Sequence, residues 1–230
     1  MYSTLSLKRL LALLGLPPLA IFILLTLLGH APADVKGGWS LAKSVVSYWT
    51  LFIVLFGGSS KWWAPWRLFW RIPGLQRLLF PDLNGTWRGT TSSNWPSVKA
   101  MFDAYQKNEK TGHAGALDTV ALQEDAIEFK IIASFFRFRI EARLSNTGAT
   151  SHSVSARVAW NDHLERFEIC YLYDQGTPSP KLTDEASHLG AANLVLDMDA
   201  PALSGEYWTK RSWRSGLNTA GLIEVRRVSR

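Results

Sequence analysis

Two long apolar stretches near the start of the chain constrain its fold most, because side chains of this kind must be shielded from water. Leu10–Leu28 holds 19 residues without a charge, and at about 1.5 Å per residue a helix of this length nearly crosses the roughly 30 Å hydrocarbon core of a bilayer. Trp39–Gly58 makes a second span if its one lysine reaches the interface. The sequence therefore predicts two transmembrane helices in residues 1–60, the first kinked or locally broken at Pro17 and Pro18.

The basic residues are concentrated beside these stretches. Residues 1–80 hold eight Lys and Arg against one acid, whereas residues 81–230 hold 17 against 18, so the formal charge of +6 comes from the first part. A sequence pI near 9.5 would by itself suggest a nucleic-acid partner. Because the excess basic residues lie beside apolar stretches, they indicate a membrane instead. By the positive-inside rule, both termini, and with them residues 81–230, are expected on the cytoplasmic side.

A linker is predicted at residues 61–80, between the spans and the rest of the chain. Its tryptophans alternate with basic residues and are expected to lie in the membrane interface until Pro73-Gly74 ends the segment. The alternative is that these rings pack against the domain that follows. The residues concerned are Trp62, Trp63, Trp66, Trp70, Arg67 and Arg71.

A cleaved secretory signal is a rival interpretation of the N-terminus. Lys8-Arg9, a leucine-rich core and Ala31-Pro32-Ala33 imitate such a signal. The apolar core is long for a signal, however, and a proline lies inside the cleavage motif. The single cysteine, Cys170, excludes an internal disulfide framework and agrees with a reducing compartment.

Residues 81–230 are expected to form one all-β domain, because their dominant hydrophobic period is two. Phe138, Ile140 and Ala142 alternate with Arg139 and Glu141, as in a strand with one buried face. Short turns favour an eight-stranded antiparallel up-and-down barrel, with a helix inserted in residues 97–123. The predicted strands are Leu83–Thr91, Ala126–Ala133, Phe135–Leu144, His152–Trp160, Arg166–Asp174, Ala192–Met198, Leu203–Arg211 and Ala220–Val228.

An eight-stranded barrel can hold side chains or one small ligand in its interior. Trp87 follows a Gly-x-Trp pattern and is expected to plug one end. Tyr171 and Tyr173 lie on the apolar face of their strand, where they serve either as plain core or as stacking surfaces for flat bases. No catalytic motif, metal-ligand spacing or phosphate loop is present in the sequence, so neither an enzyme nor a bound cofactor is predicted.

Arg211, Thr209 and Tyr207 share one face of a predicted strand. The interior placement of this face is favoured, because the opposite placement would bury Glu206 and Lys210. An arginine inside the barrel needs an acid or an anionic ligand as its partner. The candidate ligand-binding residues are therefore Arg211, Thr209, Tyr207, Tyr171 and Tyr173.

Several short motifs, in this order behind two membrane helices, resemble the two-transmembrane β-barrel effectors of bacterial cyclic-oligonucleotide anti-phage signalling, the CBASS systems. The resemblance covers the whole chain. The motifs are Pro81-x-Leu83-x-Gly85-x-Trp87-x-Gly89, Tyr171-x-Tyr173, His188-x-Gly190, Leu203-x-Gly205-x-Tyr207-x-Thr209-x-Arg211 and Gly221-x-Ile223.

This resemblance implies a cytosolic barrel, STING-like in its role, that senses a cyclic dinucleotide made by a partner nucleotidyltransferase. It further implies a bacterial inner-membrane protein that forms a homo-oligomer on activation and then disrupts the membrane, which arrests or kills the infected cell. No DNA or RNA partner is expected. Ser44, Ser47 and Thr50 are candidates for contacts between membrane helices, or else hydroxyls that a membrane helix simply tolerates.

Two other functions stay open for the same barrel. The first is a membrane-tethered, lipocalin-like barrel that binds lipid or another apolar ligand, with Arg211 at its mouth or outside it. The second is a membrane-anchored hydrolase, which would need an acid or a nucleophile close to Arg211. Titration with cyclic dinucleotides separates the first from a receptor, and ligand turnover separates the second.

Overall fold

The computed structural model describes residues 7–30, 34–57, 76, 81–107, 120–133, 138–180 and 185–229. The chain divides into two compact units, which are considered separately below. The second comprises Leu83–Ala133 and Phe138–Arg230 and contains the whole barrel.

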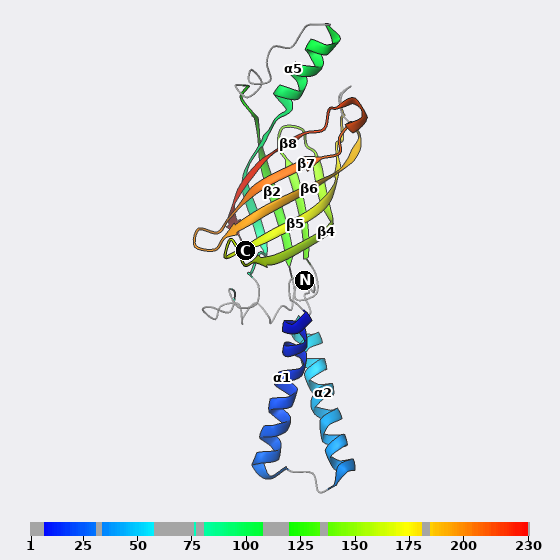
Figure 1. Cartoon of the computed structure of the whole chain (residues 1–230), viewed down its shortest axis with the longest axis vertical. Helices are drawn as coiled ribbons and strands as arrows, with labels where there is room; N and C mark the ends of the chain where they lie inside the picture. The colour runs from blue at the N-terminus through cyan, green and yellow to red at the C-terminus, as the bar shows by residue number, and fades with distance from the viewer. Residues whose placement is uncertain are drawn as a thin grey trace. The chain divides into compact units, whose positions relative to one another are not determined.

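Two helices form the N-terminal unit (Figure 1). Helix α1 (Leu7–Leu25) runs unbroken through Pro17 and Pro18. It ends instead in the π-helical turn η1 (Thr26–His30), where Gly29 adopts a φ of 85°. Helix α2 (Val35–Gly57) contacts α1 and begins where an Asp34 carboxylate oxygen accepts the Gly37 N–H at 2.7 Å. A local break at the prolines is therefore wrong, a kink there stays a prediction, and the two predicted helices are present.

The membrane role of these helices stays a prediction. In the part of the chain that the structure describes, no helix is both long and apolar enough to cross a bilayer. The Ser44 and Thr50 hydroxyls donate to carbonyl oxygens of their own helix, at 3.0 Å to Ser40 and 2.8 Å to Val46. Their donors are therefore used within α2. The interfacial tryptophans predicted in 61–80 lie outside the described residues.

Eight antiparallel strands follow in sequence order and close into a barrel, since β1 pairs with both β2 and β8 (Figure 1). The predicted up-and-down order is confirmed. The strands are β1 (Gly85–Ser93), β2 (Gln123–Ala133), β3 (Phe138–Leu144), β4 (Thr150–Asn161), β5 (Arg166–Gly176), β6 (Ser187–Asp197), β7 (Ala202–Thr209) and β8 (Ala220–Ser229).

One end of the barrel is filled by side chains. Trp87 is fully buried there, and its indole N–H donates to the Leu83 carbonyl at 3.0 Å. The Asn84 side chain accepts the Ala133 N–H at 2.7 Å, and the Arg227 guanidinium lies 4.6 Å from the centre of the Trp87 ring. Apolar side chains pack around this plug. Trp87 therefore closes the base of the barrel, as predicted.

The boundaries of several elements differ from those predicted. Strand β6 begins at Ser187, five residues early, because small Ala and Gly side chains hide its alternation. Strand β7 ends at Thr209, since Ser212 turns the chain with a φ of 40° into the 3-10 turn η3 (Trp213–Ser215). Arg211 is thus in a turn rather than in a strand. The inserted helix, α5 (Trp95–Gln106), starts before residue 97, with Pro96 in its first turn.

Candidate ligand pocket at the open end of the barrel

A cavity of about 220 Å³ lies at the end of the barrel opposite Trp87. It is bounded by the last residues of the odd-numbered strands and the first residues of the even-numbered strands, which meet at this end because the order is up-and-down. Its walls are polar near the mouth, whereas its floor is apolar and aromatic. The lining includes Thr91, Ser93, Trp95, Gln123, Asp125, Phe129, Ser151, Tyr171, Tyr173, Gln175, Thr177, His188, Tyr207, Thr209, Arg211, Thr219 and Ile223.

Two tyrosines of β5 form part of the floor. The rings of Tyr171 and Tyr173 lie 5.6 Å apart, and Tyr171 meets Phe129 edge-on at 6.4 Å. Burial raises the pKa of both phenols, and the neighbouring Tyr173 and Tyr207 raise them further. Both rings therefore stay neutral in the physiological range and keep their hydroxyl protons for hydrogen bonding.

Gly190 positions the Tyr173 ring. The two residues face each other across β5 and β6, and a Cβ at position 190 would overlap the ring and hydroxyl of Tyr173. The ring edge and hydroxyl of Tyr173 thus lie against the glycine backbone. Glycine is required here for close approach rather than for an unusual backbone angle.

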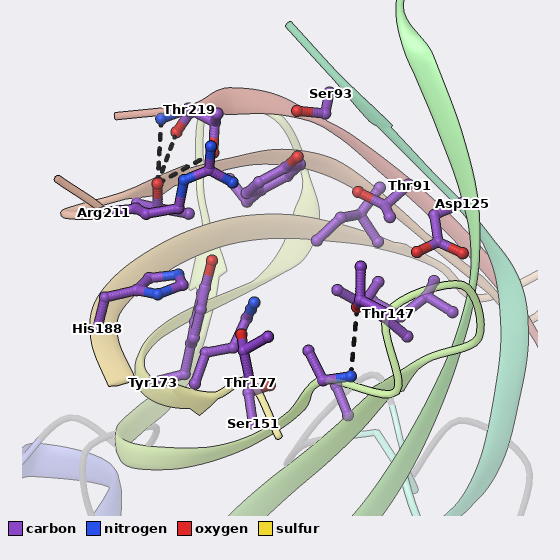
Figure 2. Close-up of a pocket in the computed structure, with 18 of the residues that line it drawn as sticks. Thr91, Ser93, Asp125, Thr147, Ser151, Tyr173, Thr177, His188, Arg211 and Thr219 are labelled. Atoms are coloured by element: carbon purple, nitrogen blue, oxygen red, sulfur yellow. Dashed lines mark hydrogen bonds between the residues drawn. The ribbon is translucent and has the colours of Figure 1, made fainter. Parts of the chain in front are cut away.

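Two nitrogen-bearing side chains, the guanidinium of Arg211 and the imidazole of His188, lie at the mouth. Figure 2 shows both residues, with Tyr173, on one side of the cavity. The Arg211 guanidinium lies 4.1 Å from the centre of the Trp95 ring, in a cation–π contact. This contact joins the turn after β7 to the first residue of α5. It holds the guanidinium plane at the mouth, where an anionic group would enter.

Two threonines fix the strand end beside Arg211. The side-chain oxygens of Thr209 and Thr219 lie 3.0 Å apart, and the Thr219 N–H donates to the Thr209 hydroxyl at 3.1 Å. The Thr209 N–H in turn donates to the Thr219 carbonyl at 2.8 Å. These bonds tie the end of β7 to the residue before β8, which makes a rigid base for the Arg211 turn.

The opposite wall carries the acidic group of the pocket. Figure 2 shows Asp125 and Thr91 across the cavity from Arg211. Asp125 is buried, and one of its carboxylate oxygens accepts the Asn146 N–H at 3.1 Å, which holds the turn between β3 and β4. The pocket thus offers donors on one side and acceptors on the other. Among the described residues, no group of His, Cys, Asp and Glu is arranged to hold a metal ion.

All five predicted site residues line this one cavity. The interior placement of Tyr207 and Thr209 is therefore correct, and Trp208 between them points outward with 51% of its surface exposed. Sequence reasoning missed His188, Asp125 and Trp95. His188 has the same parity as Gly190, which would have placed it inside a longer β6, whereas no local pattern marks Asp125 or Trp95.

Comparison with known proteins connects this geometry to a family. Residues 78–227 match the family described as "Cap15, cyclic dinucleotide receptor domain". The chain belongs to the Cap15 family. A relative, CD-NTase-associated protein 15 of Escherichia albertii, is 29% identical over 161 residues, which is 70% of this chain and 69% of the relative. The resemblance to CBASS effectors is confirmed by these two matches.

The Cap15 match covers the barrel and its cavity, from before β1 to within β8. This chain is therefore a CBASS effector with a cyclic dinucleotide receptor domain. The match begins at residue 78 and does not include helices α1 and α2.

Proposed function

We propose that the cavity at the open end takes one base of a cyclic dinucleotide, while Arg211 holds a phosphate at the mouth. The observation that supports this most is the meeting of Arg211, His188 and the Tyr171–Tyr173 pair in one cavity. A cyclic dinucleotide combines flat bases with anionic phosphates, which are the groups that aromatic rings and guanidinium recognise. The barrel is then a receptor that releases its ligand unchanged.

The size of the cavity favours partial insertion of the ligand. Pockets that enclose a small molecule measure about 300–1,000 Å³, and the cavity here measures about 220 Å³. A nucleobase fits this space more readily than a whole cyclic dinucleotide. The phosphates and the second base would then stay at the mouth, beside Arg211 and Trp95.

The polar lining argues against the apolar-ligand function. Thr91, Asp125 and Thr219 are buried polar residues of the cavity wall, and a lipid chain would offer no hydrogen bond to the acceptor capacity that the Asn146 and Thr209 contacts leave open. Arg211 does lie at the mouth, as that function requires. The polar wall near the mouth nevertheless suits a ligand that carries its own hydrogen-bond donors and acceptors.

At the level of the cell, we propose an inner-membrane effector with its N-terminus and barrel in the cytoplasm. Residues 10–28 and 39–58 would cross the membrane, supported by their apolar sequences and the basic residues on both flanks. Ligand binding would favour an assembled state, which requires that the assembly bind the ligand more tightly than the single chain does. The assembled helices would disrupt the membrane.

Replacement of Arg211 by alanine tests the site. The substitution removes a charge-assisted contact worth about 1.5–3 kcal/mol and should weaken binding by about tenfold to more than a hundredfold. Affinity is measured by isothermal titration of the full chain with cyclic di-GMP, cyclic di-AMP and cyclic UMP–AMP. Arg214→Ala is the matched control, because Arg214 is exposed and does not line the cavity. Unchanged affinity in Arg211→Ala would remove this residue from the site, and turnover of the nucleotide would favour the hydrolase.

A further inference from the structure

One part of the outer barrel surface is apolar. Leu172 on β5, Ala191 on β6 and Trp208 on β7 are direct register neighbours; Leu172 and Trp208 are exposed on the outside, and Ala191 between them is buried. Leu189 and Trp213 extend this group, and Leu172, Leu189, Trp208 and Trp213 each expose between 49% and 55% of their surface. We call these five residues the β5–β7 apolar face. A monomer rarely exposes large side chains in such a contiguous group unless it binds something there.

Other parts of the outer surface combine charged pairs with exposed apolar side chains such as Val154, Leu222 and Val228. Arg88 pairs with Glu128 across β1 and β2, and Arg226 lies 3.6 Å from Glu224 on β8. The β5–β7 apolar face instead borders a surface groove of about 610 Å³, lined by all five of its residues. This groove is on the outside of the barrel and shares only Thr209 with the lining of the ligand cavity.

One acidic and one basic side chain flank the apolar face on opposite sides, as a twofold contact requires. Asp174 and Lys210 lie on opposite sides of Leu189. Asp174 is the register partner of Leu189 on β5, and the Lys210 N–H donates to the Leu189 carbonyl at 2.7 Å. A twofold axis close to the direction of β6 exchanges the β5 side with the β7 side. It brings Asp174 of each copy over Lys210 of the other, and Leu172 over Trp208.

The middle of the face suits the same arrangement. Ala191 lies between Leu172 and Trp208 and is buried, so no large side chain stands at the axis itself, and two sheets can approach there while the larger side chains interdigitate on either side. An apolar centre with charged residues at its edge is also the usual composition of a protein–protein interface.

We infer that the β5–β7 apolar face is a self-association surface, on which a second copy of this chain packs about a twofold axis along β6. The inference rests on the proposed function, because it names the contact that would carry ligand-driven assembly. Strands β6 and β7 present alternate residues to the two sites: His188 and Thr209 line the cavity, whereas Leu189 and Trp208 lie on the outer face. A ligand in the cavity thus contacts the strands that form the surface.

Cross-linking of the full chain in mild detergent tests this surface. Residues on the twofold axis lie beside their own copies, so Leu189→Cys in a Cys170→Ser background should form an intermolecular disulfide on mild oxidation. Lys130→Cys in the same background, on the outer face of β2 across the barrel, is the matched control and should form no intermolecular disulfide. Absence of the position 189 cross-link, or equal cross-linking at both positions, would overturn the inference.

Charge exchange gives a second measurement. Lys210→Asp should reduce the cross-linked fraction at position 189 at least threefold, and Asp174→Lys in the same chain should restore it. Failure of the double exchange to restore cross-linking would refute the twofold pairing. The Leu189→Cys variant is also treated with a water-soluble maleimide in lipid vesicles. If the thiol is protected but forms no disulfide, the membrane covers this face, and that result would also refute the twofold pairing.

The same samples separate this inference from the proposed function. Cross-linking is measured with and without cyclic di-GMP, cyclic di-AMP and cyclic UMP–AMP, and affinity for each is measured by titration. A specific cross-link without any nucleotide binding supports the surface and contradicts the ligand. Nucleotide binding without the cross-link supports the ligand and contradicts the surface.

Discussion

At the scale of single residues, the Tyr173 ring keeps its position because Gly190 has no side chain. Gly190→Ala should therefore displace the ring and lower the free energy of unfolding by about 1–3 kcal/mol, measured by urea denaturation. Affinity for the cyclic dinucleotide should fall in parallel. The control is the same glycine substitution in a Tyr173→Ala background, where the overlap is removed. An equal loss of stability in both backgrounds would show that the ring does not set the requirement.

The buried phenols give the barrel an alkaline limit. The pKa values of Tyr171 and Tyr173 are raised in the folded state, chiefly by burial, so unfolding releases protons above the ordinary tyrosine pKa of about 10. The stability from these neutral phenols is fully present below that pH and is lost as pH rises further. Absorbance at 295 nm should show a class of the six tyrosines that ionises only when the barrel unfolds. A Tyr171→Phe, Tyr173→Phe variant should lack that class.

At the scale of elements, the start of α5 is tied to the start of β8. The Asn94 N–H donates to the Ala220 carbonyl, and the Ala220 N–H donates to the Asn94 side chain, both at 3.0 Å. Asn94→Ala removes the second bond and should cost about 1 kcal/mol. Hydrogen exchange at the Ala220 amide should become faster, whereas Asn218→Ala, at an exposed loop position, should leave it unchanged. No change at Ala220 in the Asn94 variant would mean that the side chain is not what protects this amide.

The strands were predictable where large apolar side chains alternate with charged ones. In β5 the alternation of Ile169 and Tyr171 with Glu168 and Cys170 placed the strand and its buried face correctly. In β6 the inward position 190 is Gly, whereas the outward Leu189 is apolar and exposed, so the alternation is hidden, and the strand start and the place of His188 in the cavity were missed. The contact between Trp95 and Arg211 joins residues far apart in sequence, and only the closed barrel brings them together.

At the scale of the whole molecule, the proposed function places ligand sensing and membrane action in different parts of the chain. Deletion of residues 1–60 should preserve affinity for the cyclic dinucleotide, because every lining residue of the cavity lies beyond residue 90. The same deletion should abolish toxicity in cells that produce the nucleotide, measured by growth and membrane-potential dyes. Cell killing by the truncated chain would contradict membrane disruption by the N-terminal helices.

The Trp87 plug has a kinetic consequence. A barrel sealed at its base is a cup with a single opening, so a ligand enters and leaves past the same side chains. An element that covers this opening equally in the empty and the filled barrel slows association and dissociation by the same factor. Residence time then changes while affinity does not. Helix α5 begins at this opening with Trp95, so a change in this helix that leaves Arg211 in place would alter how long a bound ligand stays without altering its affinity.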